Sequence, residues 1–284
     1  MERCSQSNEK NDSITRKLIV ELKDGINYLK KSTGIVPRLA VLQVGDREDS
    51  NLYIKMKENM AKKIGVEISK YKFNEDVHQR KIFSLINSLN LDPNIHGIIV
   101  QLPLPNGFSE FELTEAIDCI KDVDGFHSSN LTRITKNCVF NPPCTPSGII
   151  RLLSEYNIDL EGKLVTIVGR SSVVGIPLFH MLSNLNATVT LCHSKTRDLE
   201  SMVKMADIVI SAVGKPALIK GHWIKPGAIV VDVGISYVDG ILQNARLKDS
   251  SKKSGKRIVG DVDFENALKN VSLITPVPGG VGNH

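Results

Sequence analysis

The sequence lacks features that define several common classes of protein. It contains no run of about 20 apolar residues, the length that a membrane-spanning helix requires, and its start, MERCSQSNEKNDSITRK, has no apolar signal core. Aromatic residues make up only 5% of the chain, and the basic residues are spread out rather than clustered. We therefore expect no membrane and no nucleic-acid partner, and a cytoplasmic protein, with an organellar location left open.

Cysteine is also scarce. The five cysteines are odd in number and form no CxxC pair; they are Cys4, Cys119, Cys138, Cys144 and Cys192. Their neighbours in the sequence are mostly apolar. We expect reduced, mostly structural thiols and no metal site.

What is present is enough for a sizeable core. With 284 residues, of which 41% are hydrophobic, the chain is long enough for two domains. The net charge of +5 is mildly basic, which suits an anionic small molecule.

The first half alternates between helical and extended patterns. Apolar spacing predicts helices over 14–31, 53–64 and 78–89, and strands over 38–44, 66–73 and 97–100. This alternation is typical of a parallel sheet covered by helices. The segment HSSNLTRITKNCVFNPPCTPSG, which follows KDVDGF, lacks such a pattern, and its prolines indicate a domain boundary.

A second alternation follows that boundary. It predicts helices over 146–156, 174–185 and 199–205, and strands within LVTIVGR, ATVTLCH, DIVISAV, AIVVDVG and LITPVP. Residues 245–257 are rich in serine and lysine and are expected to form a solvated surface loop.

The stretch VTIVGRSSVVG is an apolar strand that runs into a glycine-rich turn and a helix. Gly169 allows the tight turn, Gly175 allows close packing, and the helix N-terminus can bind a phosphate. Ser171 replaces the middle glycine of the GxGxxG pattern, so a plain strand-to-helix connection is an equal alternative at this point.

The end of the next strand favours a dinucleotide. A site that prefers NAD carries Asp or Glu there, whereas this chain has Ser194 and Lys195, with Arg170 in the preceding turn. These donors suit a 2′-phosphate, so NADP is favoured over NAD. The alternative is that Arg170 and Lys195 are simply exposed charges.

The first half contains the polar residues suited to chemistry. Tyr53 and Lys57 are four residues apart on one predicted helix, and Gln101 directly follows a buried strand. The acidic turn KDVDGF contributes Asp124. Without this context, a Tyr/Lys pair at such spacing is usually a half-buried surface contact. Together the four side chains could bind a flat heterocycle with polar edges at the end of a sheet.

Five segments then carry a resemblance: SNLYIKMK, IIVQLPLP, KDVDGF, VGRSSVVGIP and TPVPGGVG. In this order, and joined by PCTPSG, CHSKT and DVGI, they resemble the methylenetetrahydrofolate dehydrogenase/methenyltetrahydrofolate cyclohydrolase family from about residue 38 to 282. The resemblance implies an α/β fold with two domains and the active-site cleft between them. Residues 1–143 would form a folate-binding catalytic domain, 144–274 a Rossmann-like NADP-binding domain, and 275–284 a return segment.

The resemblance also implies the activity and the site. The protein would oxidise 5,10-methylenetetrahydrofolate with NADP and hydrolyse the product to 10-formyltetrahydrofolate, within the one-carbon metabolism that serves purine biosynthesis. The implied catalytic residues are Tyr53, Lys57, Gln101 and Asp124. The implied further contacts to substrate are Leu102, Pro278, Gly279 and Gly280. The implied cofactor contacts are Thr145, Gly169, Arg170, Ser171, Ser194, Val213, Gly214, Gly234, Ile235 and Thr275.

The residue types fit that chemistry. Hydride transfer needs mainly positioning, whereas the cyclohydrolase step moves protons. A lysine beside a cationic substrate gives up its proton more readily, so Lys57 is a plausible proton carrier that Gln101 would position. Tyr53 would stack on the folate, which is expected to include polyglutamylated forms, and Asp124 would bind the pterin N–H groups.

Two departures and two alternatives accompany the resemblance. The family pattern continues after GGVG into PMT and a final helix, whereas this sequence reads GGVGNH, and the family's first strand and its DGK-like start are hard to find in residues 1–13. The alternatives are a dehydrogenase without cyclohydrolase activity and a non-catalytic nucleotide-binding module.

The strands in KYKFNE and TVTLCH are expected near sheet edges, and we expect a homodimer that pairs through the cofactor domains.

Overall fold

The computed structural model describes residues 2–239 and 256–281 and separates into two compact units. One unit, here called the N-terminal unit, is Thr15–Cys144. The other, here called the C-terminal unit, is Thr145–His284 together with Met1–Ile14. The first helix, α1 (Glu2–Thr33), contains one of the two division points, and it occupies the region in which the family's first strand was sought.

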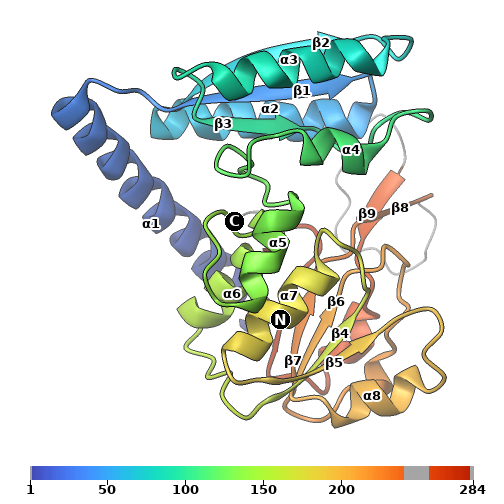
Figure 1. Cartoon of the computed structure of the whole chain (residues 1–284). Helices are drawn as coiled ribbons and strands as arrows, with labels where there is room; N and C mark the ends of the chain where they lie inside the picture. The colour runs from blue at the N-terminus through green and yellow to red at the C-terminus, as the bar shows by residue number, and fades with distance from the viewer. Residues whose placement is uncertain (1, 240–255, 282–284) are drawn as a thin grey trace. The chain divides into compact units, whose positions relative to one another are not determined.

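The N-terminal unit is built on a three-stranded parallel sheet in the order β2-β1-β3 (Figure 1). Its strands are β1 (Arg38–Val44), β2 (Glu67–Phe73) and β3 (Gly97–Val100). Its helices after α1 are α2 (Glu48–Ile64), α3 (Gln79–Leu91), α4 (Glu110–Glu115) and α5 (Ser128–Thr135). The predicted parallel sheet with covering helices is confirmed.

Alternate residues of the central strand pack on opposite faces of this sheet. Leu42 packs with Ile82 and Ile86 of α3, whereas Val41 packs with Ile54 of α2. Figure 1 shows α3 and α2 on the two sides of the strands. Because both faces are covered, β1 and β3 consist of nearly continuous apolar residues, as buried parallel strands usually do.

No element was predicted in the segment after KDVDGF, but α5 forms there. His127 begins the helix by accepting a hydrogen bond from the Ser129 N–H at 3.0 Å, and Ile134 and Asn130 are buried. The short helix α4 was also not predicted; Ser109 caps it through the Glu112 N–H. Both helices depend on side-chain caps and span too few residues for a helical period to be visible in the sequence.

The C-terminal unit is built on a five-stranded parallel sheet in the order β10-β7-β6-β4-β5. The strands are β4 (Leu164–Val168), β5 (Thr188–Cys192), β6 (Ile208–Ser211), β7 (Ile229–Asp232) and β10 (Leu273–Ile274). The chain leaves β4 for β5 on one side and then returns to β6 on the other. The carboxyl ends of β4 and β6 therefore form the switch point at which such sheets bind ligands.

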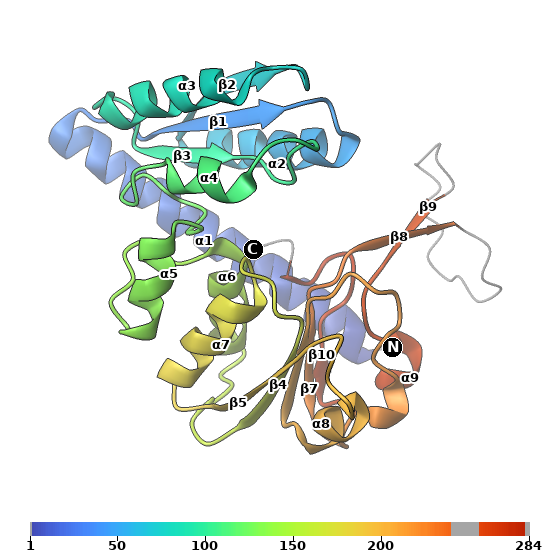
Figure 2. The same ribbon diagram turned by 45° about the vertical axis from the view of Figure 1, so that its right-hand side comes forward.

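Helices cover both faces of this second sheet, with α6 and α7 on one side and α8 and α9 on the other (Figure 2). Their bounds are α6 (Cys144–Glu155), α7 (Gly175–Asn184), α8 (Leu199–Met205) and α9 (Phe264–Ala267), and a 3-10 turn, η1, spans Gly221–Trp223. On the α8 side, Val203 and Ala267 are fully buried against Val209 and Val230. The predicted Rossmann-like alternation is thus confirmed.

An antiparallel hairpin was not predicted. It consists of β8 (Ser236–Asp239) and β9 (Lys256–Val259) and forms a separate two-stranded sheet. The loop expected over 245–257 is therefore wrong for its last two residues, which belong to β9, and its other residues lie outside the described part of the chain. The basic pattern around β9 is typical of a surface loop, which hid the strand.

The two strands predicted near sheet edges do lie at edges. β2 is one of the two edge strands of the first sheet, and β5 is one of the two edge strands of the second. They differ in charge, since β2 contains Glu67, Lys70 and Lys72, whereas β5 has the sequence TVTLC and contains no charged residue. Charged side chains on an edge strand oppose pairing with another sheet, so β5 is the better suited of the two to pair.

Candidate functional site

Lys57 and Gln101 come together in the N-terminal unit as predicted. Gln101 directly follows β3, and its Oε1 atom lies 3.5 Å from the Nζ atom of Lys57 in α2. The Gln101 side chain also donates from Nε2 to the Leu102 carbonyl at 2.8 Å, and the Gln101 N–H donates to the Leu42 carbonyl at 2.9 Å. The main chain and the side-chain amide of Gln101 are therefore both held by hydrogen bonds, and the amide oxygen faces the lysine.

Asp124 lies on the other side of the lysine. Its Oδ2 atom is 3.9 Å from Lys57 Nζ, and its side chain is only 16% exposed. Burial raises the pKa of the Asp124 carboxyl, and the Lys57 ammonium opposes that rise. The only other polar contact of the carboxylate among the described residues is the Cys144 thiol, whose sulfur lies 3.9 Å from Oδ1. A carboxylate this buried with such weak partners is well placed to bind N–H donors of a ligand.

Tyr53 lies one helical turn before Lys57 in α2, so both side chains leave the same face of the helix. Tyr53 is 43% exposed, and Lys57 is partly buried. An exposed ring beside a lysine, an amide and a carboxylate can cover one face of a flat heterocycle. The four residues predicted as catalytic are thus all in one unit.

The neighbouring carboxylate, Asp122, has a different task from Asp124. It is 2% exposed and accepts hydrogen bonds from the Gly125 N–H at 3.1 Å, the His127 N–H at 2.8 Å and the Asn130 side chain at 3.0 Å. These contacts fix the turn that carries Asp124. Gly125 has φ of 73°, and a Cβ there would lie 2.7 Å from the Pro143 nitrogen, so the close packing of this turn requires glycine.

Cys144 is a neighbour of the site that the sequence did not identify. Its sulfur lies 3.3 Å from the Val123 carbonyl oxygen, and burial of the thiol, followed by the charge of Asp124, raises its pKa to about 11. The described cysteines differ in exposure. Cys138 and Cys144 are exposed as residues, Cys119 is half-buried and only Cys192 is buried, while the side chain of Cys4 lies outside the described part of the chain.

In the C-terminal unit the glycine-rich turn has the predicted close packing. A Cβ on Gly169, whose φ is 123°, would lie 2.4 Å from the Ala212 carbonyl oxygen, and one on Gly175 would lie 2.0 Å from the Gly169 carbonyl oxygen. Ser171, which replaces the middle glycine, accepts from the Val174 N–H at 3.1 Å through its Oγ atom. The serine thus stabilises the turn that leads into α7.

The predicted 2′-phosphate donors lie beyond the ends of two paired strands. Val168 of β4 pairs with Cys192 of β5, so Arg170 and Ser194 are each two residues past that pair. Arg170, Ser194 and Lys195 are all exposed. The carboxyl ends of β4 and β5 therefore present two cations and a hydroxyl on neighbouring segments.

Further predicted cofactor contacts follow β6 and β7. Val213 and Gly214 are the second and third residues after β6, and Gly234 and Ile235 are the second and third after β7. Thr275 follows β10, and its Oγ1 atom accepts from the Asp232 N–H at 2.8 Å, so this hydroxyl joins two adjacent strands. Thr145 is in the first turn of α6. Eight of the ten predicted cofactor contacts thus lie in turns after β4, β5, β6 and β7, the expected edge of the sheet.

Two buried carboxylates at that same edge were missed. They are Asp232, at the end of β7, and Asp261, which are 3% and 0% exposed. The signal for Asp232 was present, since an acidic residue stands inside the apolar run AIVVDVG. Their contacts are described below.

The predicted substrate contacts Pro278, Gly279 and Gly280 belong to the C-terminal unit. A Cβ on Gly280 would lie 2.5 Å from the Pro276 carbonyl oxygen, so the chain turns back closely on itself here. Gly282, the last residue of the predicted glycine turn, lies outside the described part of the chain. Leu102, the remaining substrate contact, packs partly buried against the core of the N-terminal unit.

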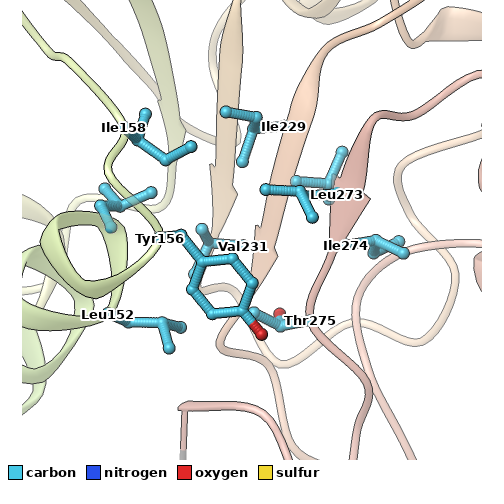
Figure 3. Close-up of a pocket in the computed structure, with 10 residues that line it drawn as sticks. Leu152, Tyr156, Ile158, Ile229, Val231, Leu273, Ile274 and Thr275 are labelled. Carbon is cyan, nitrogen blue, oxygen red and sulfur yellow. The ribbon is translucent and has the colours of Figure 1, made fainter. Parts of the chain in front are cut away.

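A separate apolar pocket lies between α6 and the strands β7 and β10 (Figure 3). Figure 3 shows the Tyr156 ring in this pocket with its hydroxyl toward Thr275. Its volume of about 30 Å³ is room for a single water molecule. This pocket is too small for a folate or a nucleotide, and it contains none of the polar residues described above except Thr275.

The C-terminal unit fits a phosphate-bearing dinucleotide on the chemistry of its donors. The turn after β4 precedes the N-terminus of α7, and cations stand at the next strand end. Around Gly214, whose φ is 63°, a Cβ would meet no atom within 4 Å, so the main chain here is open to a ligand. Among residues 2–239 and 256–281, no group of three acidic, histidine or cysteine residues could hold a metal ion.

Comparison with known proteins assigns both units. The family model described as the tetrahydrofolate dehydrogenase/cyclohydrolase catalytic domain matches residues 10–124, and the one described as its NAD(P)-binding domain matches residues 143–284. The chain is 45% identical over 269 residues to the bifunctional protein FolD of Nautilia profundicola, covering 95% of this chain and 89% of that protein.

Two solved structures agree with this assignment. The bifunctional FolD of Campylobacter jejuni is 43% identical, with a TM-score of 0.87 and coverage of 96% of this chain and 92% of that one. The Trypanosoma brucei FolD, solved with NADP and an inhibitor, is 34% identical, with a TM-score of 0.87 and coverage of 95% and 90%. The chain described here therefore belongs to the tetrahydrofolate dehydrogenase/cyclohydrolase family, with its catalytic and its NAD(P)-binding domain.

Proposed function

We propose that the protein oxidises 5,10-methylenetetrahydrofolate with NADP in preference to NAD, and then hydrolyses 5,10-methenyltetrahydrofolate to 10-formyltetrahydrofolate at the same site. Family membership supports both reactions. The single observation that carries the assignment of residues is the position of Lys57 Nζ, 3.5 Å from Gln101 Oε1 and 3.9 Å from Asp124 Oδ2.

In the cyclohydrolase step, Lys57 is the proton carrier. When the cationic substrate is bound beside it, the Lys57 ammonium gives up a proton to solvent. A water oxygen then bonds to the methenyl carbon, and the Lys57 amine takes a proton from that water. The resulting ammonium then returns the proton to the ring nitrogen as the bond between that nitrogen and the carbon breaks. The hydroxyl left on the carbon loses its proton to solvent as the C=O bond forms, which leaves a formyl group on the other nitrogen. Gln101 Oε1 holds the amine in place throughout, because the amide is itself fixed by the Leu102 carbonyl.

Asp124 binds the substrate and Tyr53 covers it. The carboxylate has two oxygens with only weak protein partners, so it can accept two N–H groups from the pterin ring. Tyr53 presents an exposed ring on the same helical face as Lys57. Leu102, Pro278, Gly279 and Gly280 are proposed as further contacts, and the cleft between the domains stays a prediction.

On the cofactor side, NADP when bound accepts the hydride. Arg170, with Ser194, would bind the 2′-phosphate beyond the ends of β4 and β5. Gly169, Ser171, Val213, Gly214, Gly234 and Ile235 would contact the cofactor through turns after the strands, with Thr145 and Thr275 nearby. The chain offers no carboxylate at the end of β5 for a ribose 2′-hydroxyl, since that segment reads CHSKT.

The test is an absorbance assay with methylenetetrahydrofolate and either NADP or NAD. NADP-dependent formation of the methenyl compound, followed by its hydrolysis, supports the proposal. Oxidation without faster hydrolysis would identify a dehydrogenase alone, and no turnover would leave a nucleotide-binding module.

We also propose a homodimer that pairs through the C-terminal unit, supported by the uncharged edge strand β5. A cytoplasmic location and a role in supplying formyl groups for purine biosynthesis complete the proposal. None of the helices among the described residues is long and apolar enough to cross a membrane. The four described cysteines are free thiols, as in a reducing compartment.

A further inference from the structure

Asp232 and Asp261 are buried carboxylates in the C-terminal unit that the proposed reaction does not use. Asp232 is the last residue of β7, and Asp261 comes two residues after β9. Neither makes a salt bridge with a described residue. Burying two such groups is costly unless hydrogen bonds replace the lost water, so their partners indicate what they do.

Asp261 holds the main chain on both sides of Gly214. Its Oδ2 atom accepts from the Val213 N–H at 2.8 Å, and its Oδ1 atom accepts from the Lys215 N–H at 2.8 Å. The Ser211 hydroxyl adds a third bond, to Oδ2, at 3.1 Å. The carboxylate therefore sets the path of the open turn after β6 through main-chain donors.

Asp232 performs the matching task for the turn after β7. Its Oδ1 atom accepts from the N–H groups of Gly234 and Asp261, each at 3.0 Å, and its Oδ2 atom accepts from the Val262 N–H at 2.9 Å. Asp232 thus fixes the turn at Gly234 and, in addition, the main chain of Asp261.

The two turns are packed directly against these carboxylates. A Cβ on Gly234 would lie 2.1 Å from Asp261 Oδ1, and one on Gly260 would lie 2.0 Å from Asp232 Oδ2. Asp261 leaves no room for a side chain at position 234. The carboxylate therefore requires glycine there and limits where the Gly234 main chain can lie. One acidic side chain thereby couples the turn after β6 to the turn after β7.

We propose that Asp261 is a positioning residue for the dinucleotide, which sets the turns at Gly214 and Gly234 against it, with Asp232 in support. This inference rests on the proposed function, because it takes these two turns as cofactor contacts. Asparagine at position 261 has nearly the same shape but only one acceptor oxygen. It would place an NH2 group against either the Val213 or the Lys215 N–H, and the turn would have to move.

The experiment compares Asp261→Asn with Asp207→Asn in the full chain. Asp207 is in the same unit at the opposite edge of the sheet, where it accepts from the Leu164 N–H at 3.0 Å and from Lys225 at 2.6 Å. Asp261→Asn should raise the Kd and KM for NADP by on the order of 10- to 100-fold, as expected for a lost hydrogen bond to a charged group. Asp207→Asn should leave both values within about twofold.

Cyclohydrolase turnover of added methenyltetrahydrofolate is the second readout, because its proposed residues Tyr53, Lys57, Gln101 and Asp124 all lie in the N-terminal unit. Positioning by Asp261 predicts that the cyclohydrolase kcat is kept while NADP affinity falls. Equal loss of both activities, or unchanged NADP affinity, would overturn the inference.

If Asp261→Asn fails to fold, Ser211→Ala tests the inference instead. This variant removes a single donor to Asp261 and should raise the NADP KM by a smaller factor. An unchanged KM in that variant would then overturn the inference. A wild-type protein that neither binds NADP nor oxidises methylenetetrahydrofolate would instead refute the proposed function.

Discussion

The Nζ atom of Lys57 lies 3.9 Å from the Oδ2 atom of Asp124, so the chain places a cationic proton carrier beside a half-buried carboxylate. The distance is longer than that of a hydrogen bond, and the Gln101 oxygen stands nearer to the lysine. The lysine is thus held by the amide and remains available to a third group, which the proposed reaction identifies as the attacking water.

Replacing Lys57 by methionine separates the two activities. The variant keeps the apolar stem but loses the amine, so cyclohydrolase turnover should fall by roughly 100-fold or more, the usual contribution of a positioned acid or base. The dehydrogenase should survive in part, because hydride transfer takes no proton from the enzyme. Methenyltetrahydrofolate absorbance measures both.

Lys55→Met is the matched control, because Lys55 is an exposed residue of the same helix. It should leave both activities unchanged. Gln101→Ala should weaken the cyclohydrolase in the same direction as Lys57→Met. Hydrolysis at the wild-type rate by Lys57→Met would show that the lysine is not the proton carrier.

Replacing Arg170 by alanine tests the preference for NADP. Loss of one charged partner of the 2′-phosphate should cost about 1.5 to 3 kcal/mol of NADP binding and leave NAD binding nearly unchanged. Calorimetric titration with each cofactor measures this. Lys163→Ala, just before β4 at the opposite edge, is the control and should change neither. An equal loss for NADP and NAD would instead give Arg170 a role in the fold or at the pyrophosphate.

The uncharged edge strand β5 predicts the assembly. Light scattering at micromolar concentration should give about twice the chain mass of 31.3 kDa. Thr190→Lys adds a charge to an exposed position of β5 and should shift the mass toward that of the single chain. Ser69→Lys, on the already charged edge strand β2, should not. A monomeric wild-type protein would refute the dimer.

Burial of Asp232 predicts a pH dependence of stability. Burial, reinforced by the charge of Asp261, raises the pKa of Asp232 from 3.8 to about 6. The folded state binds the Asp232 proton more tightly than the unfolded state does. The contribution of this proton to the free energy of unfolding is therefore complete below about pH 4. It is lost as the pH rises to about 6, at up to about 1.4 kcal/mol for each unit.

The measurement is urea unfolding of the wild type and of Asp232→Asn between pH 4 and pH 7. The difference in unfolding free energy, wild type minus variant, should decrease from pH 4 to pH 6 and then level off. Carboxylates that do not interact with Asp232, such as Asp124 in the other unit, cancel in this difference. A difference that stays constant across the range would contradict the assignment.

The Cys144 thiol should be slow to alkylate. A pKa of about 11 against an ordinary 9.0 lowers the thiolate fraction at pH 8 by about 100-fold, and the thiolate is the nucleophile. Iodoacetamide should therefore label Cys144 about 100-fold more slowly in the folded than in the urea-denatured protein, as mass spectrometry can follow. Equal rates in the two states would show that the sulfur is not held against Val123 and Asp124.

The sequence predicted most of the fold because most strands of both sheets are short, nearly continuous apolar runs between turn residues. Arg38–Val44 and Gly97–Val100 have the predicted bounds. It failed where structure depends on single side-chain contacts, as in α5, which His127 begins. It failed also where a strand has the composition of a surface loop, as in β9.

The candidate site divides in the same way. Lys57, Gln101 and Asp124 could be named from their motifs, and their mutual distances agree with the idea that the amide orients the lysine. Asp261 could not be found, because the segment IVGDVDF, with two aspartates beside a glycine, looks like a surface turn. Asp261 matters because it accepts hydrogen bonds from main-chain N–H groups about 50 residues away in the chain. Such groups are present at almost every position, so the sequence does not reveal which of them donate.

Asp122 and Asp261 share one property, since each accepts hydrogen bonds chiefly from main-chain N–H groups of a turn that carries predicted binding residues. Main-chain groups are the same whichever side chain a position carries. Residues displayed on these turns can therefore be exchanged without removing the bonds that shape the turns. In directed evolution, libraries that vary such positions while keeping both aspartates and their glycines should retain folded members at a higher rate than libraries of equal size that vary the anchors.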